Sequence, residues 1–194
     1  MSINEVRYLP ECGSTNAYVK EHFEEFGPVG AVYTENQTAG RGRLGRSWVN
    51  AEGRALYYTV AIREPLAQPS TLPLLASLAV RTQLKLRYGV DCQIKWPNDL
   101  LLNGKKIVGI LCEGVSYGYQ MQGRGIVCGI GINLAQPRRE ALPCEGVEGA
   151  IEAEIGQCLG QPLGVGVEVY RCALQLQRGA VGQVRRVEVA LGLG

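Results

Sequence analysis

The sequence has a single histidine and lacks the arrangements in which histidine or cysteine normally carries chemistry. His22 lies among charged residues of a predicted helix, where we expect it on the surface, so Ser-His-Asp and Cys-His catalysis are not supported. The seven cysteines are scattered too widely to form a CxxC metal pair. We expect them to be small buried thiols of a protein in a reducing cytoplasm.

Long apolar runs and an excess of charge are also missing. No run approaches the roughly 18 apolar residues of a membrane helix, and residues 1–10 lack the apolar core of a secretory signal. We therefore expect a cytoplasmic protein without a membrane partner. The net charge of +2 provides no overall basic field that would attract nucleic acid. With 194 residues, 46% hydrophobic and 20% charged, the chain has the composition of an ordinary globular domain.

Positive charge and glycine are concentrated between Gln37 and Trp48. This segment reads Gln-Thr-Ala-Gly-Arg-Gly-Arg-Leu-Gly-Arg-Ser-Trp, with three arginines and three glycines in residues 40–46. It has too much glycine for a helix interior and no period-two alternation, so we expect a mobile loop. Exposed backbone N–H groups and guanidinium groups bind phosphates and carboxylates. By itself, such a loop also fits a solvated surface loop or a non-specific RNA-binding tract.

The rest of the chain alternates strand and helix signals. Helices are expected at 17–26, behind a cap at Ser14–Asn16, and at 71–88, 149–159 and 165–177. Strands are expected at 30–34, 55–62, 90–96, 100–102, 105–112, 115–119 and 124–132. Asn103-Gly104 predicts a type I′ hairpin turn. The order indicates an α+β fold, a mixed and largely antiparallel sheet with helices on one face.

The residues that could take part in binding or catalysis are cations and polar groups on loops and hairpins. Neither a Walker-type phosphate loop nor a dinucleotide fingerprint is present. The candidates are Arg41, Arg43, Arg46, Lys95, Lys105 and Lys106, accompanied by Gln37, Asn98, Asp99 and Asn133. Such a set suits a reaction in which the protein positions reactants and neutralises negative charge, as in nucleotidyl transfer to a carboxylate. Asp99 is the natural candidate for a Mg²⁺ contact.

Five motifs, in order, closely resemble the catalytic domain of biotin–protein ligases (biotin–acetyl-CoA-carboxylase ligases). They lie within about residues 5–136: Ser14-Thr-Asn16, Gln37 to Trp48, Lys95-Trp-Pro-Asn-Asp99, Lys106-Ile-Val-Gly-Ile-Leu111 and Gly129-Ile-Gly-Ile-Asn133. The resemblance implies a fold like that of class II aminoacyl-tRNA synthetases and biotin ligases. It also implies a two-step reaction. Biotin and Mg-ATP give biotinyl-5′-adenylate and pyrophosphate, and a lysine of a biotin carboxyl carrier protein then takes the biotinyl group. ATP and Mg²⁺ would be co-substrates, with no tightly bound cofactor.

The resemblance further implies roles for individual residues. Biotin would be held by Ser14, Thr15, Asn16, Gln37, Arg41, Gly42, Arg43, Lys106, Gly109, Leu111, Gly129 and Gly131. ATP would be held by Arg43, Arg46, Trp48, Asn98, Asp99, Lys106 and Asn133, with Asp99 facing Mg²⁺. The catalytic candidates are Lys106, Arg41 and Arg43. Without the resemblance, Ser14–Asn16 would be a helix cap, Lys95 and Trp96 strand-end packing, and Gly129 and Gly131 a bend in the sheet.

The chain differs from many members of this family at both ends. Its motifs begin within about fifteen residues of Met1, so we expect no N-terminal helix-turn-helix domain and no binding to DNA. We expect a catalytic core at 1–148 and a helical extension of the same domain at 149–194, without a full SH3-like barrel. The expected partner is a biotin carboxyl carrier protein, and the expected state a monomer or homodimer. A lipoate– or octanoyl–protein ligase and a non-catalytic biotin- or RNA-binding module remain alternatives.

Overall fold

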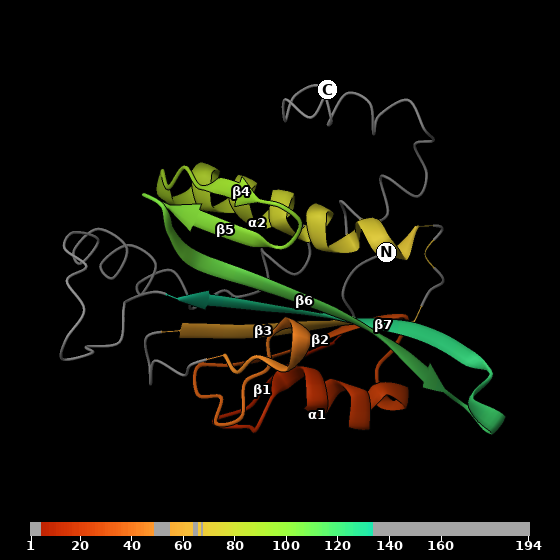
Figure 1. Ribbon diagram of the computed structural model, residues 1–194. Coiled ribbons are helices and arrows are strands. Elements are labelled where there is room, and N and C mark those ends of the chain that lie inside the picture. The colour runs from red at the N-terminus through yellow and green to blue at the C-terminus, as the bar shows by residue number, and fades with distance from the viewer. Residues whose placement is uncertain (1–4, 49–54, 64–65, 67, 134–194) are drawn as a thin grey trace.

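Seven strands form one sheet at the centre of the computed structural model, which describes residues 5–48, 55–63, 66 and 68–133 (Figure 1). The sheet order is β1-β2-β3-β7-β6-β5-β4. The strands are β1 Glu5–Tyr8, β2 Val29–Thr34, β3 Ala55–Ile62, β4 Gln93–Lys95, β5 Asp99–Leu102, β6 Lys105–Tyr117 and β7 Gly123–Asn133. Only β1 and β2 are parallel, and every other described pair is antiparallel. The predicted α+β fold with a mixed, largely antiparallel sheet is confirmed.

The two α-helices pack against opposite faces of this sheet, α1 Thr15–Glu21 on one and α2 Leu72–Tyr88 on the other (Figure 1). Strand β3 shows the reason, because all eight of its residues are buried. Val60 joins the large core with Leu72 of α2, whereas the adjacent Ala61 packs with Val19 of α1. Successive side chains of a strand point to opposite faces, so a strand that is apolar throughout must be covered on both. The prediction of helices on one face is therefore wrong.

The helix boundaries follow the capping signals in part. Ser14 caps α1, and its Oγ accepts a hydrogen bond from the Ala17 N–H at 3.5 Å. The helix ends at Glu21 rather than at residue 26, and a short 3₁₀ turn, η1 Phe23–Glu25, follows it. The turn buries Phe23 in the smaller core with Val19. Helix α2 covers the predicted range and stops at Gly89, whose φ of 68° suits a left-handed C-cap.

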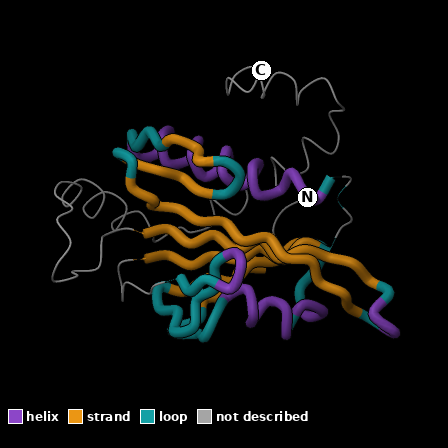
Figure 2. The backbone as a smooth tube through the Cα atoms, in the orientation of Figure 1, coloured by secondary structure: helices purple, strands orange, loops and turns teal. Residues whose placement is uncertain are grey.

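Strands β5, β6 and β7 form consecutive antiparallel hairpins. Asn103 and Gly104 have φ values of 50° and 75°, as the predicted type I′ turn requires. The separate strands expected at 105–112 and 115–119 are one strand of 13 residues, β6, which pairs with β7 from Val108 to Tyr117. The β6–β7 hairpin projects beyond the rest of the sheet (Figure 2). Its tip is the 3₁₀ turn η4 Tyr119–Met121. The side chains of Tyr119 and Met121 are both exposed.

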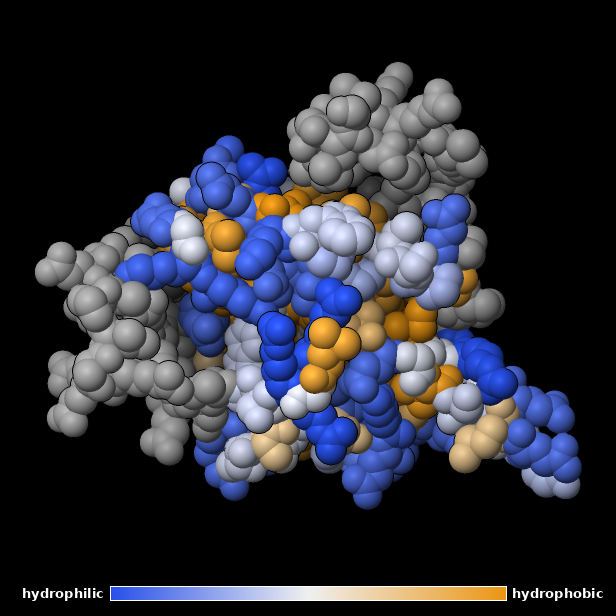
Figure 3. All heavy atoms as spheres, in the orientation of Figure 1, coloured by the Kyte–Doolittle hydropathy of each residue, from blue (hydrophilic) through white to orange (hydrophobic). Residues whose placement is uncertain are grey.

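The remaining structural predictions concern cysteines, membranes and the C-terminal part of the chain. Cys12, Cys92, Cys112 and Cys128 are free thiols, and Cys92 and Cys128 are buried. Burial raises the pKa of Cys12 and of Cys92 to about 11. Within the described ranges, no helix has the length and apolar character that a membrane crossing would require. The face shown in Figure 3 is largely hydrophilic, with separate hydrophobic patches. The helices expected at 149–159 and 165–177, and the boundary at 148, lie outside the described residues.

Candidate active site

A cleft of about 460 Å³, partly open to solvent, lies between the sheet, the start of α1 and the loop formed by residues 37–48. All twelve residues expected to hold biotin line this cleft, although they come from widely separated segments of the chain. Its lining residues are Ser14, Thr15, Asn16, Gln37, Arg41, Gly42, Arg43, Trp48, Tyr57, Asn98, Lys106, Gly109, Ile110, Leu111, Gly129, Ile130 and Gly131. The fold thus brings the five motifs of the sequence to one place.

The inner end of the cleft is a network of buried polar side chains. Gln37 Oε1 accepts from the Thr15 backbone N–H at 2.9 Å, and a backbone bridge between residues 12 and 37 holds Gln37 near the start of α1. The Thr59 hydroxyl, on β3, lies 2.8 Å from both Thr15 Oγ1 and Asn16 Oδ1. Asn16 Nδ2 donates to Leu111 O at 3.2 Å. The helix-cap interpretation of Ser14–Asn16 is thus correct for Ser14 but incomplete, since Thr15 and Asn16 line the cleft as well.

Glycines in β6 and β7 make room for the larger side chains of the cleft. Gly109 and Gly131 are direct partners across the two strands. A Cβ atom at Gly109 would lie 2.3 Å from Trp48 Cζ3, and one at Gly131 would lie 2.9 Å from Trp48 Cε2, so the indole packs against both glycines. A Cβ at Gly129 would lie 2.1 Å from Asn16 Oδ1. Since β7 is continuous through this region, these glycines serve close approach rather than a bend.

Lys106 reaches the cleft because β6 contains an irregularity. Leu100 pairs with Val108 but Leu101 pairs with Lys106, so Ile107 is an extra residue in the ladder. Both Ile107 and Val108 pack into the large core, and Lys106 lies on the cleft face with Gly109. Strict alternation would instead have placed Lys106 on the core face with Val108, and re-aiming a side chain in this way is a common role of a β-bulge.

The Lys106 ammonium is fixed by a carboxylate and an aromatic ring. Lys106 Nζ lies 2.7 Å from Asp99 Oδ1 and 5.1 Å from the centre of the Trp48 ring. Asp99 is mostly buried and is not among the cleft-lining residues. Its carboxylate contacts the cleft residue Lys106. Among the described residues, no group of three or more His, Cys, Asp or Glu side chains could hold a metal ion. The Mg²⁺ contact of Asp99 therefore stays a prediction.

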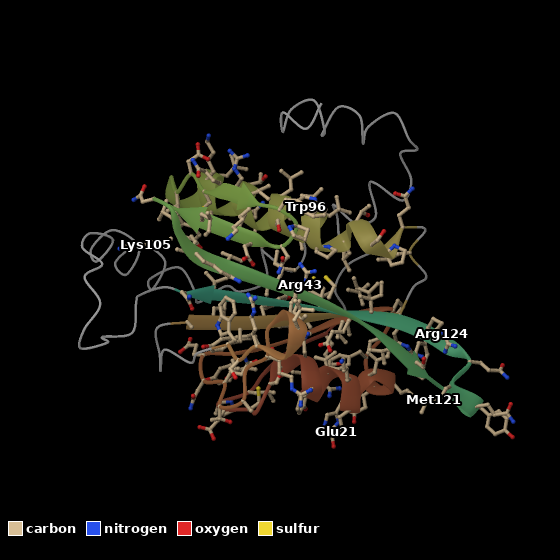
Figure 4. All side chains as sticks on the ribbon, viewed as in Figure 1. Glu21, Arg43, Trp96, Lys105, Met121 and Arg124 are labelled. Atoms are coloured by element: carbon tan, nitrogen blue, oxygen red, sulfur yellow. The ribbon has the colours of Figure 1, made fainter. Side chains whose placement is uncertain are left out.

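Arg43 attaches the arginine-glycine loop to β6. Its Nη1 donates to Asn98 Oδ1 at 3.0 Å, and the Asn98 side chain in turn donates to Ile110 O at 2.9 Å. The loop also folds on itself, since Trp48 N–H donates to Gly40 O at 3.0 Å. The segment predicted as a loop is therefore a loop, with one 3₁₀ turn, η2 Arg43–Gly45. In Figure 4, Arg43 lies in front of β6, and Trp96 lies above it beside the β4–β5 turn.

Three residues expected on the ATP side lie outside the cleft lining. Arg46 is exposed on the outer part of the loop, Asn133 pairs with Ala55 at the end of β7, and Asp99 lies behind Lys106. The expectations for these residues stay untested. Lys95, on the edge strand β4, and Trp96 are exposed.

Sequence reasoning missed several residues of the site. Tyr57, Ile110 and Ile130 line the cleft, and Glu113 binds Asn16 from just outside it. Thr59 was missed as well, and it shares one face of β3 with Tyr57, so a period-two count links these two residues but needs one of them as a starting point. The same count from Leu111 would have found Glu113.

The cleft residues fall within a segment that matches a known protein family. The Biotin/lipoate A/B protein ligase family matches residues 9–133. The chain belongs to this family. The family match ends where β7 ends and begins just after β1, so it covers strands β2 to β7, both α-helices and all the residues of the cleft.

Among curated relatives, the bifunctional ligase/repressor BirA of Bacillus spizizenii is 39% identical over 132 residues, which are 66% of this chain and 40% of that protein. A biotin–[acetyl-CoA-carboxylase] ligase of Paracoccus denitrificans is 37% identical over 131 residues, covering 66% of this chain and 53% of that protein. The chain thus spans about two fifths of the length of the BirA protein from Bacillus spizizenii.

Solved structures show the same fold. The biotin protein ligase of Aquifex aeolicus in complex with biotin and ATP superposes with a TM-score of 0.73 at 24% identity, covering 95% of this chain and 76% of that one. The biotin protein ligase of Leishmania major in complex with biotin gives a TM-score of 0.70 at 25% identity, covering 96% and 79%.

Proposed function

We propose that this cleft activates biotin with Mg-ATP to biotinyl-5′-adenylate, and that the biotinyl group then passes to a lysine of a biotin carboxyl carrier protein. The observation that carries the proposal is the convergence of all twelve predicted biotin-binding residues on one cleft. The relatives named as biotin ligases support the same chemistry.

In the first step, a carboxylate oxygen of biotin attacks the α-phosphorus of ATP, and pyrophosphate leaves with the electrons of the broken P–O bond. The Lys106 ammonium would neutralise the carboxylate and phosphate oxygens as charge builds up between them. Its ion pair with Asp99 holds it at the cleft before substrate arrives. Arg41 and Arg43 would add positive charge from the loop. Mg²⁺ would enter the cleft as part of the Mg-ATP substrate.

In the second step, the amine of the acceptor lysine attacks the biotinyl carbonyl carbon, and AMP leaves with the electrons of the mixed anhydride bond. The loop would shield the anhydride from water until then, because Arg43 ties it to Asn98 over the cleft.

The polar inner end of the cleft favours biotin over lipoate or octanoate. Thr15, Asn16 and Gln37 are buried and line the cleft there, and the buried Thr59 hydroxyl supports Thr15 and Asn16 from behind. A buried polar group without a partner costs about 1–3 kcal/mol, so an aliphatic chain would be a poor ligand at this end. A ureido ring, with two N–H groups and a carbonyl, offers matching partners.

The test is pyrophosphate release from Mg-ATP with biotin, lipoate, octanoate or no acid. We expect release that depends on biotin, together with biotin transfer to a purified biotin carboxyl carrier protein. Release with lipoate or octanoate instead would support the adenylation reaction and show that biotin is not the substrate. Biotin binding without release would leave a binding module, and salt-dependent RNA affinity without biotin binding would favour the RNA alternative.

A further inference from the structure

Glu113, on β6, makes a contact with the cleft that the proposed reaction does not use. Its Oε2 accepts a hydrogen bond from Asn16 Nδ2 at 2.9 Å, and its Oε1 lies 2.5 Å from Lys20 Nζ on α1. Burial raises the pKa of Glu113, but the hydrogen bonds from Lys20 and Asn16 and the charge of Arg41 outweigh it, so that pKa is lowered. At neutral pH Glu113 is therefore a carboxylate, which can only accept hydrogen bonds.

This contact fixes the orientation of the Asn16 amide. Nδ2 faces two groups that can only accept, the Glu113 carboxylate and the Leu111 carbonyl, and these use both of its N–H bonds. Oδ1 must then face the Thr59 hydroxyl, which lies 2.8 Å away. A flipped amide would direct an oxygen at the carboxylate, so the flip is unfavourable while Glu113 is present.

The orientation of Asn16 then sets the direction of the neighbouring hydrogen bonds. Each hydroxyl has one proton, and Asn16 Oδ1 has none, so Thr59 must donate to Asn16. The Thr15 hydroxyl proton then has two acceptors within reach, Thr59 Oγ1 at 2.8 Å and Gln37 Oε1 at 3.2 Å. Gln37 Oε1 also accepts from the Thr15 backbone N–H at 2.9 Å. Whichever acceptor it takes, the Thr15 proton points into the protein, and the Thr59 proton points to Asn16, whose amide is held by Glu113.

The consequence lies at the cleft surface. The Thr15 hydroxyl proton is used within the protein, by Thr59 or Gln37, and Asn16 Oδ1 has no proton to give, so both oxygens can offer only lone pairs to a ligand. Both residues line the cleft. We propose that Glu113, held by Lys20, is a positioning residue that fixes this direction, so that the cleft presents acceptor oxygens to ligand N–H groups. This inference rests on the proposed function, since the N–H groups would be those of the biotin ureido ring.

The variant that tests it is Glu113→Lys, which replaces the acceptor facing Asn16 with a donor and should flip the Asn16 amide. The matched control is Lys20→Met, which removes the ion pair but keeps the Glu113 acceptor. The ligands are biotin and the two cyclic carbamate analogues in which oxygen replaces one ureido N–H. Affinities are measured by calorimetry without ATP, after thermal unfolding has shown that each variant folds.

We expect the wild-type chain to prefer biotin over at least one carbamate by about tenfold or more, because an oxygen would face an acceptor there. Glu113→Lys should lower biotin affinity at least about tenfold and bring the biotin-to-carbamate ratio close to one or below it. Lys20→Met should keep the wild-type ratio. A merely structural role of the ion pair would affect both ligands alike and would make the two variants equivalent.

Each other outcome decides against a specific statement. If the wild-type chain prefers biotin and Glu113→Lys keeps that preference, the positioning role of Glu113 is wrong and the proposed function stands. If biotin and both carbamates bind the wild-type chain equally, recognition of N–H groups is wrong. If biotin does not bind the wild-type chain, the proposed function fails and this inference with it. Should Glu113→Lys not fold, Glu113→Leu removes the acceptor without adding charge and should reduce the ratio in the same direction.

Discussion

Lys106 is the single residue on which the chemistry of the cleft depends most. Its side chain is 41% exposed, whereas that of its partner Asp99 is 19% exposed. The carboxylate is therefore the fixed member of the pair, and the ammonium is the member that a substrate can reach. The extra residue Ile107 turns Lys106 toward the cleft, so the position of this charge is set by the strand and not by a flexible loop.

We expect Lys106→Ala to lower biotin-dependent pyrophosphate release by at least about a hundredfold, because one preorganised charge at the reacting oxygens is lost. The control is Lys105→Ala, which removes the same charge one residue earlier, outside the cleft lining. Circular dichroism checks that both variants fold, and Lys105→Ala should release pyrophosphate at the wild-type rate. Comparable rates for the two variants would show that Lys106 has no special role.

Among the structural elements, the loop of residues 37–48 lines the cleft and is largely exposed to solvent. Arg43 fixes it to β6 through Asn98, while Leu44 next to it is exposed and has a φ of 57°, a conformation that glycine adopts more easily. Variants of these two neighbours can therefore separate the Arg43–Asn98 contact from the backbone flexibility of the loop, because Arg43 makes the contact and Leu44 does not.

Arg43→Gly should release the loop and let biotinyl-adenylate escape, so that lysines of bystander proteins become biotinylated. Leu44→Gly adds a glycine to the same turn but keeps the Arg43–Asn98 bond, and it should not increase bystander labelling. Incubation with biotin, Mg-ATP and serum albumin, followed by a streptavidin blot, measures the difference. Equal labelling by both variants would mean that loop flexibility, not the arginine contact, retains the adenylate.

Strands β6 and β7 contribute a glycine surface on which Trp48 packs. Gly109→Ala would place a methyl group 2.3 Å from Trp48 Cζ3 and must displace the indole. We expect this variant to fold and to bind biotin or ATP at least about tenfold more weakly, since the cleft changes shape. Gly114→Ala, on the same strand, adds a methyl group where no atom lies within 4 Å, and should bind as the wild-type chain does. Unchanged affinities in Gly109→Ala would show that Trp48 is free to move without effect on the ligand.

At the scale of the whole molecule, the sequence predicted most of the elements but not their placement. Local signals are strong where one residue type decides the geometry, as at Asn103-Gly104 or the cap at Ser14. The side of the sheet on which each helix packs depends on contacts between distant segments, such as that of Ala61 with Val19.

The candidate site was predicted through its motifs, and its supporting residues were not. A bulge at Ile107 places the Lys106 side chain on the cleft face of β6. The orientation of the Asn16 amide follows from Glu113, nearly a hundred residues later in the sequence. Ile107 has no local signal as a bulge, and the strand alternation that places Glu113 on the face of Leu111 does not reveal its contact with Asn16. A bulge appears only when two strands are paired, and a hydrogen bond between α1 and β6 requires the complete sheet.

In the described part of the chain, the last strand in sequence occupies a central position in the sheet. Strand β7, the last in sequence, lies between β3 and β6 in the middle of the sheet, and the family match ends with it at residue 133. Among the described residues, the members of the two larger hydrophobic cores run from Val19 in the smaller core to Ile132 in the larger. Insertion of β7 must therefore complete the sheet.

A chain that ends after residue 133 should consequently fold and bind biotin, because it retains every described residue of both cores and of the cleft. We expect a cooperative thermal transition and a biotin affinity within about fivefold of that of the full chain. A chain that ends after residue 121 is the control, and it should fail to fold, since it lacks the central strand between β3 and β6. Circular dichroism and calorimetry distinguish the two. If the 133-residue chain is unfolded, residues 134–194 supply contacts without which these cores are insufficient. If it folds but does not bind biotin, those residues contribute to the ligand site itself.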